Sequence, residues 1–135
     1  MSFKFIALGC LLFCVFYTCF KKSKVKDSIN ITANEAFEMI ENNVNNPNFI
    51  ILDVRTLREF QRGYIENAIN IDFYKNNFIE QIKKLDKSKT YFVYCRSGNR
   101  SGQAVVKMQD LNFQQTYNLA NGINAWKKDN YPVIK

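Results

Sequence analysis

Residues 90–101 read TYFVYCRSGNRS, and this stretch decides the fold that we expect. Its first half is a continuous apolar run, which is typical of a strand buried on both faces of a parallel sheet. Cys95 ends this run, and the loop after it is short, polar and contains glycine. Apolar residues then recur at helical spacing from Gly102 to Leu111. The stretch therefore predicts a strand, a tight loop and a helix in immediate succession.

The rest of the chain repeats this alternation of short strands and helices. We expect strands at 29–32, 49–55, 68–71 and 115–119, and helices at 33–43, 56–62, 78–85 and 125–129. The first of these helices should bury Ala36, Phe37, Ile40 and Val44. The alternation predicts an α/β domain whose mostly parallel sheet is covered by helices on both faces. Ligands of such sheets bind at the carboxyl ends of the strands, where Cys95 lies.

The loop after Cys95 has the composition of an anion-binding turn. Its backbone N–H groups can curl inward, and the next helix adds the positive end of its dipole. Arg96 and Arg100 add positive charge, and a cysteine in such a setting titrates well below its usual pKa of about 8.5. A cysteine that closes an apolar strand is more often inert core. The polar RSGNRS sequence that follows favours a reactive thiolate instead.

The composition excludes several kinds of active site. The 135 residues contain no histidine, and Cys95 is the only one of the four cysteines outside residues 1–26. This excludes Ser-His-Asp and Cys-His catalysis, zinc sites that need histidine or several cysteines, and an internal disulfide in the folded part. We therefore expect no metal and no cofactor.

The net charge of +7 belongs mainly to the start of the chain. Residues 1–26 hold five lysines and no acidic side chain, whereas residues 27–135 hold 14 basic and 12 acidic side chains. A nucleic-acid-binding domain carries its basic excess on its folded surface. We therefore expect no nucleic-acid partner.

Residues 5–20 read FIALGCLLFCVFYTCF and carry no charge. Lys4 precedes this run and a cluster of lysines follows it, a pattern that indicates association with a membrane. We expect residues 1–26 to be a hydrophobic membrane-targeting segment with a basic tether. Residues 27–135 are expected to form one folded domain, because their length suits a single core.

The apolar run fits three kinds of targeting segment. A lipoprotein signal would be modified at Cys19 or Cys10, and a helical anchor would keep the folded part on the cytoplasmic side. Lipidation would place the folded part outside, so the side of the membrane stays open. A cleaved secretory signal ranks last, because no small-x-small site precedes Lys21.

Three blocks of sequence resemble the rhodanese sulfurtransferase family. CRSGNRS at 95–101 looks like the active-site loop of that family. Residues 53–70, DVRTLREFQRGYIENAIN, are similar to the family's D-V-R-x-x-x-E-F-x-x-G-H-I-x-G-A-x-N block. NGINAW at 121–126, followed by Tyr-Pro-Val at 131–133, is similar to its closing motif. The blocks occur in order and at the family's spacings.

Three residues depart from the family pattern. Tyr64 stands in place of a histidine, and Asn67 and Asn121 stand in place of glycines. Asparagine is the side chain that best tolerates left-handed backbone. We therefore expect both turns to be kept and Tyr64 to pack between elements.

The resemblance implies a rhodanese-like, three-layer domain with a five-stranded sheet and a two-step sulfur transfer. Cys95 would take the outer sulfur of thiosulfate or another small anionic donor as a persulfide, and a thiol or cyanide acceptor would remove it. Arg96 is expected to attract the donor, and Arg100 either binds substrate or pairs with a carboxylate such as Glu59. The substrate-binding residues expected, mainly through backbone N–H groups, are Arg96, Ser97, Gly98, Asn99, Arg100 and Ser101.

Two other functions stay open. A domain of this kind could accept a persulfide from a partner and pass it on without turnover. A small Cys-based phosphatase or arsenate reductase is less favoured. Phosphatases of this kind resemble Cys, five residues and then Arg, whereas only four residues separate Cys95 from Arg100. We expect a monomer, and the sequence identifies neither the physiological donor nor the acceptor.

Overall fold

The computed structural model describes residues 29–135. The hydrophobic segment and basic tether expected at 1–26, with Cys10 and Cys19, lie outside these residues. None of the helices within 29–135 has both the length and the apolarity needed to cross a bilayer.

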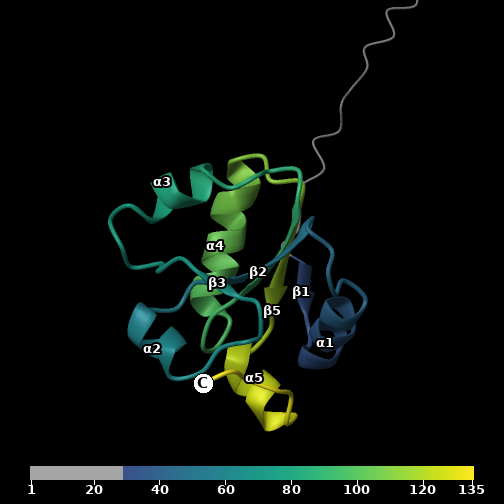
Figure 1. The fold of residues 1–135 in the computed structure, drawn as a ribbon. Helices are drawn as coiled ribbons and strands as arrows, with labels where there is room; N and C mark the ends of the chain where they lie inside the picture. The colour runs from purple at the N-terminus through teal and green to yellow at the C-terminus, as the bar shows by residue number, and fades with distance from the viewer. Residues whose placement is uncertain (1–28) are drawn as a thin grey trace, which may run out of the picture.

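Five strands form one sheet in the order β1-β5-β4-β2-β3. Figure 1 shows strands of this sheet in the middle of the molecule. Their bounds are β1 Ile29–Ile31, β2 Phe49–Asp53, β3 Ile69–Asn70, β4 Thr90–Tyr94 and β5 Gln115–Leu119. Every pairing between these strands is parallel. All the carboxyl ends therefore lie at one end of the sheet, and the amino ends lie at the other.

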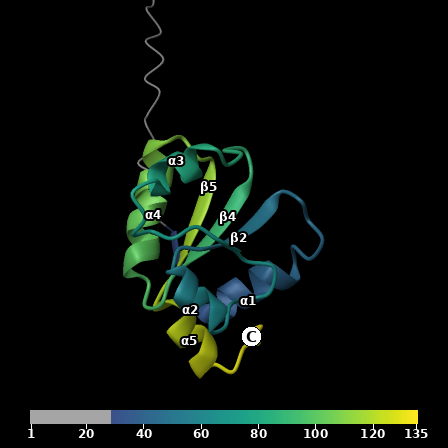
Figure 2. The ribbon, with the colours of Figure 1, turned by 60° about the vertical axis from the view of Figure 1, so that its left-hand side comes forward.

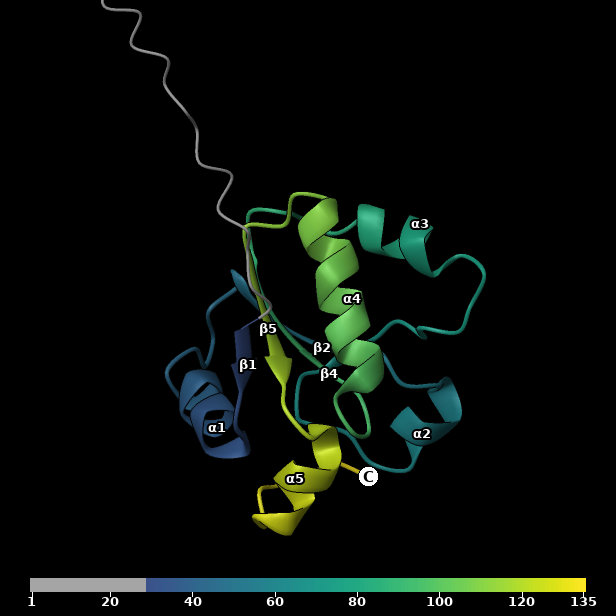
Figure 3. The ribbon, with the colours of Figure 1, turned by 180° about the vertical axis from the view of Figure 1, so that it is seen from behind.

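Helices cover both faces of the sheet. Their bounds are α1 Ala33–Glu41, α2 Leu57–Gln61, α3 Phe78–Lys83, α4 Asn99–Asp110 and α5 Gly122–Lys128. Figures 2 and 3 show α1 on one side of the strands and α4 with α3 on the other. Each side has its own core: Ala36 and Trp126 belong to one, and Ile82 and Met108 to the other. The expected three-layer α/β fold is confirmed.

The helix bounds differ from expectation most at the starts of α4 and α5, and α1 and α3 each end two residues earlier than expected. The first helix, α1, ends at Glu41, so residue 44 no longer follows its apolar stripe. The side chain of Val44 is 61% exposed, and the expectation that it is buried was wrong. The helices α4 and α5 begin at Asn99 and Gly122, each three residues earlier than expected.

Both asparagines that replace family glycines adopt left-handed backbone, with φ of 63° at Asn67 and 59° at Asn121, as expected. Within residues 29–135, every non-glycine residue with positive φ is an asparagine, the set being Asn45, Asn67, Asn112, Asn121 and Asn130. Tyr64 is half-buried and stacks on Phe60 at 4.2 Å between ring centroids. Tyr64 therefore packs against α2, which contains Phe60.

Candidate active site

The cysteine follows the middle strand of the sheet, β4, at its carboxyl end. Gly98, just before α4, adopts left-handed backbone with φ of 95°. A Cβ at this position would lie 3.1 Å from the nitrogen of Asn121 and 3.2 Å from the oxygen of Leu119. Both the backbone angle and the space favour glycine. The loop therefore turns sharply enough to bring its N–H groups back towards the thiol.

Hydrogen-bond donors converge on the sulfur of Cys95. The N–H of Gly98 donates to Sγ over 3.1 Å, and the hydroxyl of Ser101 donates over 3.3 Å. Cys95 is only 1% exposed. Burial alone would raise the pKa of the Cys95 thiol, but hydrogen bonds from the Ser101 hydroxyl and from the amides of Ser101, Ser97 and Gly98 outweigh it. The pKa of the thiol is therefore lowered, which favours the nucleophilic thiolate.

The start of α5 holds the loop from the other side. The N–H of Ile123 donates to the carbonyl of Cys95 over 2.9 Å, and the N–H of Asn124 donates to the carbonyl of Arg96 over 3.2 Å. Gly122 makes this approach possible, since a Cβ there would lie 2.5 Å from backbone atoms of both Cys95 and Arg96. The loop is thus fixed through its carbonyls while its N–H groups face the sulfur.

Arg100 closes the loop by pairing with a carboxylate. Two of its guanidinium nitrogens donate to the two oxygens of Glu59, each over 2.8 Å. The hydrogen bonds from Arg100, together with those from Thr56 and against the opposing effect of burial, lower the pKa of Glu59 to about 2. The guanidinium also lies 5.3 Å from the ring centre of Tyr74. Of the two roles expected for Arg100, the geometry shows the structural one.

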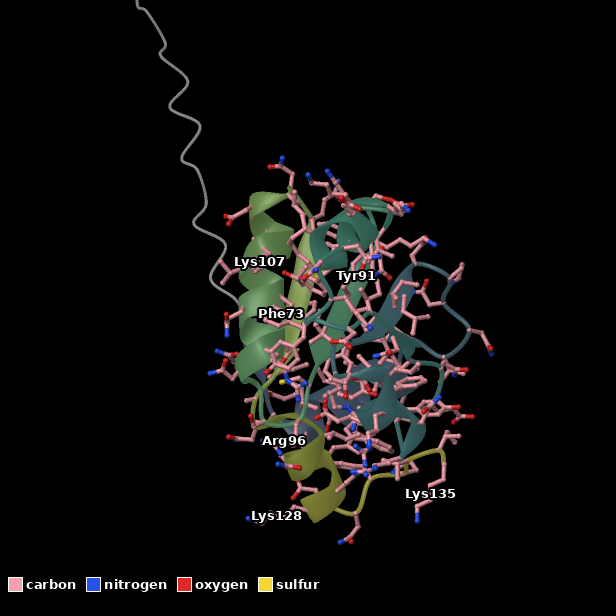
Figure 4. The ribbon with its side chains drawn as sticks, turned by 90° about the vertical axis from the view of Figure 1, so that its left-hand side faces the viewer. Phe73, Tyr91, Arg96, Lys107, Lys128 and Lys135 are labelled. Carbon is pink, nitrogen blue, oxygen red and sulfur yellow. The ribbon has the colours of Figure 1, made fainter. Side chains whose placement is uncertain are left out.

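Arg96, the residue after Cys95, is exposed, whereas the part-buried Arg100 is the cation that interacts electrostatically with the Cys95 thiol. Arg96 forms no salt bridge with any carboxylate of residues 29–135. Figure 4 shows it at the end of the molecule that also carries Lys128 on α5, whereas Lys107 lies towards the far end of α4. An exposed positive side chain, one residue after Cys95 in the sequence, is therefore available to an anion.

A second ion pair supports the adjacent strand end. Arg55 donates from Nη2 to Asp53 over 2.7 Å, and both side chains are buried. The same nitrogen donates to the carbonyl of Gly63 over 2.7 Å. This pair fixes the segment that leads to α2.

Not all of the predicted loop residues bring a donor to the sulfur of Cys95. Ser97, Gly98 and Ser101 bring donors to the sulfur, whereas the side chain of Asn99 accepts from Gln103 on the exposed side of α4 over 2.7 Å. The role of the Ser101 hydroxyl was not predicted, because the helix was expected to begin after it. Within residues 29–135, no cluster of His, Cys, Asp or Glu side chains is arranged to hold a metal ion.

Two further residues at the site were not predicted. Gly122 lies in the NGINAW motif, and a glycine at the start of a helix signals a close backbone approach. Asn118 in β5 is 5% exposed, and its Nδ2 lies 3.3 Å from the carbonyl oxygen of Gly98. The signal in the sequence was a polar residue inside a strand expected to be buried, because a buried polar side chain needs a hydrogen-bond partner.

Comparisons with known proteins agree with this geometry. A family model described as Rhodanese-like domain matches residues 32–129. An uncharacterized protein of Buchnera aphidicola is 29% identical over 134 residues, covering 96% of this chain and 86% of that protein. A sulfurtransferase of Allochromatium vinosum is 28% identical over 85 residues, covering 63% of this chain and 78% of its own. A solved rhodanese-related protein of Thermoplasma volcanium superposes with a TM-score of 0.68 at 33% identity, covering 78% of this chain and 97% of that one.

Proposed function

This chain belongs to the rhodanese-like domain family, and on that premise we propose that it is a sulfurtransferase that carries sulfur on Cys95. Its similarity to a protein named a sulfurtransferase supports an enzyme of this type. The observation that carries the proposal is the convergence of hydrogen-bond donors on Sγ. A thiol that must act as a nucleophile without histidine needs this kind of stabilisation.

In the first step, the Cys95 thiolate attacks the outer sulfur of thiosulfate. A bond forms between the two sulfur atoms, the sulfur–sulfur bond of thiosulfate breaks, and sulfite leaves with that electron pair. In the second step, a thiol or cyanide attacks the outer sulfur of the persulfide, and the electron pair of the broken bond returns to Sγ. The amide of Gly98 and the hydroxyl of Ser101 stabilise the negative charge on Sγ before the first transfer and after the second.

Two features of the loop favour a small, anionic sulfur donor. Arg96, the residue after Cys95, is exposed and supplies attraction for an anion. Because Cys95 is 1% exposed, a donor must present a terminal sulfur end-on rather than wrap around the thiol. Only four residues lie between Cys95 and Arg100, and this smaller ring suits sulfur better than phosphate.

The test uses the full chain with thiosulfate as donor and cyanide as acceptor. We expect thiocyanate to form with the unaltered protein and with Cys14→Ser, and not with Cys95→Ser. Intact mass after thiosulfate alone should show one added sulfur atom in the first two proteins only. Turnover by Cys95→Ser, or no sulfur uptake by the unaltered chain, would contradict the proposal. Sulfur uptake without turnover would identify a persulfide carrier instead.

We also propose that residues 1–26 hold this domain at a membrane. Support comes from the apolar run and its flanking lysines in the sequence. The first strand, β1, is parallel to the others, so the chain enters the domain at the end of the sheet opposite Cys95. The full chain should sediment with membranes in high salt, and its intact mass should reveal any lipid on Cys19 or Cys10. Recovery in the supernatant would contradict the proposal.

A further inference from the structure

Asn118 lies beneath the active-site loop, on the face of the sheet that α4 covers. Its neighbours across the sheet are Asn30 in β1 and Val93 in β4. It is 5% exposed, and its Nδ2 would lie 3.4 Å from a Cβ added at Gly102 in α4. The buried polar side chain of Asn118 therefore lies between the sheet and the first turn of α4. Its strand is the neighbour of β4, the strand that leads to Cys95.

The amide of Asn118 is held in one orientation. Nδ2 donates to Oδ1 of Asn30 over 2.7 Å and to the carbonyl of Gly98 over 3.3 Å. The Gly98 carbonyl can only accept, so turning the Asn118 amide over would set its own oxygen against that carbonyl, whichever way the Asn30 amide is turned. Oδ1 of Asn118 is buried and has no hydrogen-bond partner within residues 29–135. The side chain thus acts at this position only as a donor.

The Gly98 carbonyl that Asn118 holds is linked to two of the donors to the sulfur. It also accepts the N–H of Gly102 over 3.0 Å, the bond that begins α4 and thereby places the hydroxyl of Ser101. The N–H of the same glycine points at Sγ of Cys95. Fixing this carbonyl restricts the backbone angles of Gly98, which otherwise has more freedom than any other residue.

Fold stability alone does not explain an amide at this position. A buried acceptor without a partner destabilises the folded state, and an apolar side chain of similar size would avoid that penalty. We infer that Asn118 is a positioning residue, which fixes the Gly98 carbonyl so that the loop donors stay aimed at the Cys95 sulfur. The inference rests on the proposed function, because it concerns the thiol that would carry the sulfur.

The test measures ionisation of the thiol without any sulfur donor. Alkylation of Cys95 by iodoacetamide is followed across pH in the full chain, with the modified peptide identified by mass. In Asn118→Leu we expect the midpoint of the rate profile to move upward by about one pH unit, as for one weakened hydrogen bond to a charged group. Asn30→Ala removes only one of the two acceptors of the Asn118 amide, the one on the edge strand β1. We therefore expect a smaller upward shift of the midpoint.

A matched control lies two residues away on the same strand. Thr116 is 6% exposed on the same face of the sheet, and its hydroxyl makes no hydrogen bond to residues 95–101. Thr116→Val should leave the midpoint unchanged. Thermal unfolding of each variant separates a change in stability from a change in ionisation.

An unchanged midpoint in Asn118→Leu would overturn the inference, whatever happens to its melting temperature. If that variant does not fold, Asn118→Ser decides in its place, because serine is too short to reach the Gly98 carbonyl. An equal shift in Thr116→Val would also overturn it. A shifted midpoint together with absent thiosulfate turnover in the unaltered chain would contradict the proposed function while supporting this role for Asn118.

Discussion

Replacing Gly122 by alanine should damage both the stability and the activity of this protein. The added Cβ would lie 2.5 Å from the carbonyl carbon and oxygen of Arg96 and from the oxygen of Cys95, all of them backbone atoms. The residue also has φ of 58°, which costs an L-residue about 1–2 kcal/mol. Crowding a methyl group into packed structure adds about 1–3 kcal/mol. We expect the free energy of unfolding in urea to fall by about 2–5 kcal/mol.

The loss of activity should exceed what the lost stability explains. The carbonyls that the new methyl group would displace are those that Ile123 and Asn124 hold through their N–H groups. Relief of the clash therefore moves the loop that aims donors at the thiol. A displacement of about 1 Å at a reacting group can lower the rate about 100-fold, and we expect a loss of that order in folded Gly122→Ala.

The same exchange in α4 provides the control. Gly102 is helical, and the nearest atom to an added Cβ is Nδ2 of Asn118 at 3.4 Å, an ordinary contact. Gly102→Ala should therefore be neutral or should stabilise the protein by up to about 1 kcal/mol. If Gly122→Ala keeps the unfolding free energy and turnover of the unaltered chain, the close approach of α5 to the loop is not what fixes the thiol.

Three further predictions concern the charges around the sulfur. Ser101→Ala removes the hydroxyl 3.3 Å from Sγ, so the pKa of the Cys95 thiol should rise. Alkylation of Cys95 by iodoacetamide at neutral pH should therefore slow several-fold. In Glu59→Gln, stability should fall relative to the unaltered protein at neutral pH. Because Arg100 lowers the pKa of Glu59 from 4.5 to about 2, the difference in unfolding free energy should shrink as pH falls from about 4.5 towards 2. Arg96→Ala should raise KM for thiosulfate more than it lowers kcat, and added salt should reduce the difference.

Each of these predictions has a result that would contradict it. An unchanged alkylation profile in Ser101→Ala would show that this hydroxyl does not stabilise the Cys95 thiolate. A difference between Glu59→Gln and the unaltered chain that grows on acidification would mean that the ionised carboxylate is not the stabilising form. An unaltered KM in Arg96→Ala would show that the exposed cation does not attract the donor.

Local sequence predicted the strands, and it predicted the starts of the helices that have a side-chain cap. The strand β4 lies where expected, because its apolar run reports burial on both faces of a parallel sheet. The strand β5 also has the expected bounds, although its sequence, QTYNL, is largely polar. The helices α1 and α2 begin within one residue of expectation, since Thr32 and Thr56 each form a capping box. The starts of α4 and α5 were missed because Gly98 and Asn121 cap them with left-handed backbone and no side-chain hydrogen bond.

The candidate site was predictable where it is continuous in sequence. The position of Cys95 and the inward N–H groups of its loop follow from a strand that ends in a glycine-containing turn before a helix. The contributions of Asn118 and Gly122 depend on β5 and α5 lying against that loop. A polar residue in β5 and a glycine at the start of α5 mark the two positions, but local sequence does not say which segment they contact. The contact arises only when β5 pairs with β4 in the register observed.

The left-handed asparagines give this domain an unusual pattern of tolerance to substitution. All five of those within residues 29–135 are exposed, so burial alone would rank them among the most permissive positions. Their backbone angles penalise every other L-residue and β-branched residues most, which leaves glycine as the one replacement free of strain. A saturation mutagenesis screen should therefore find five isolated surface positions that are as restrictive as the interior.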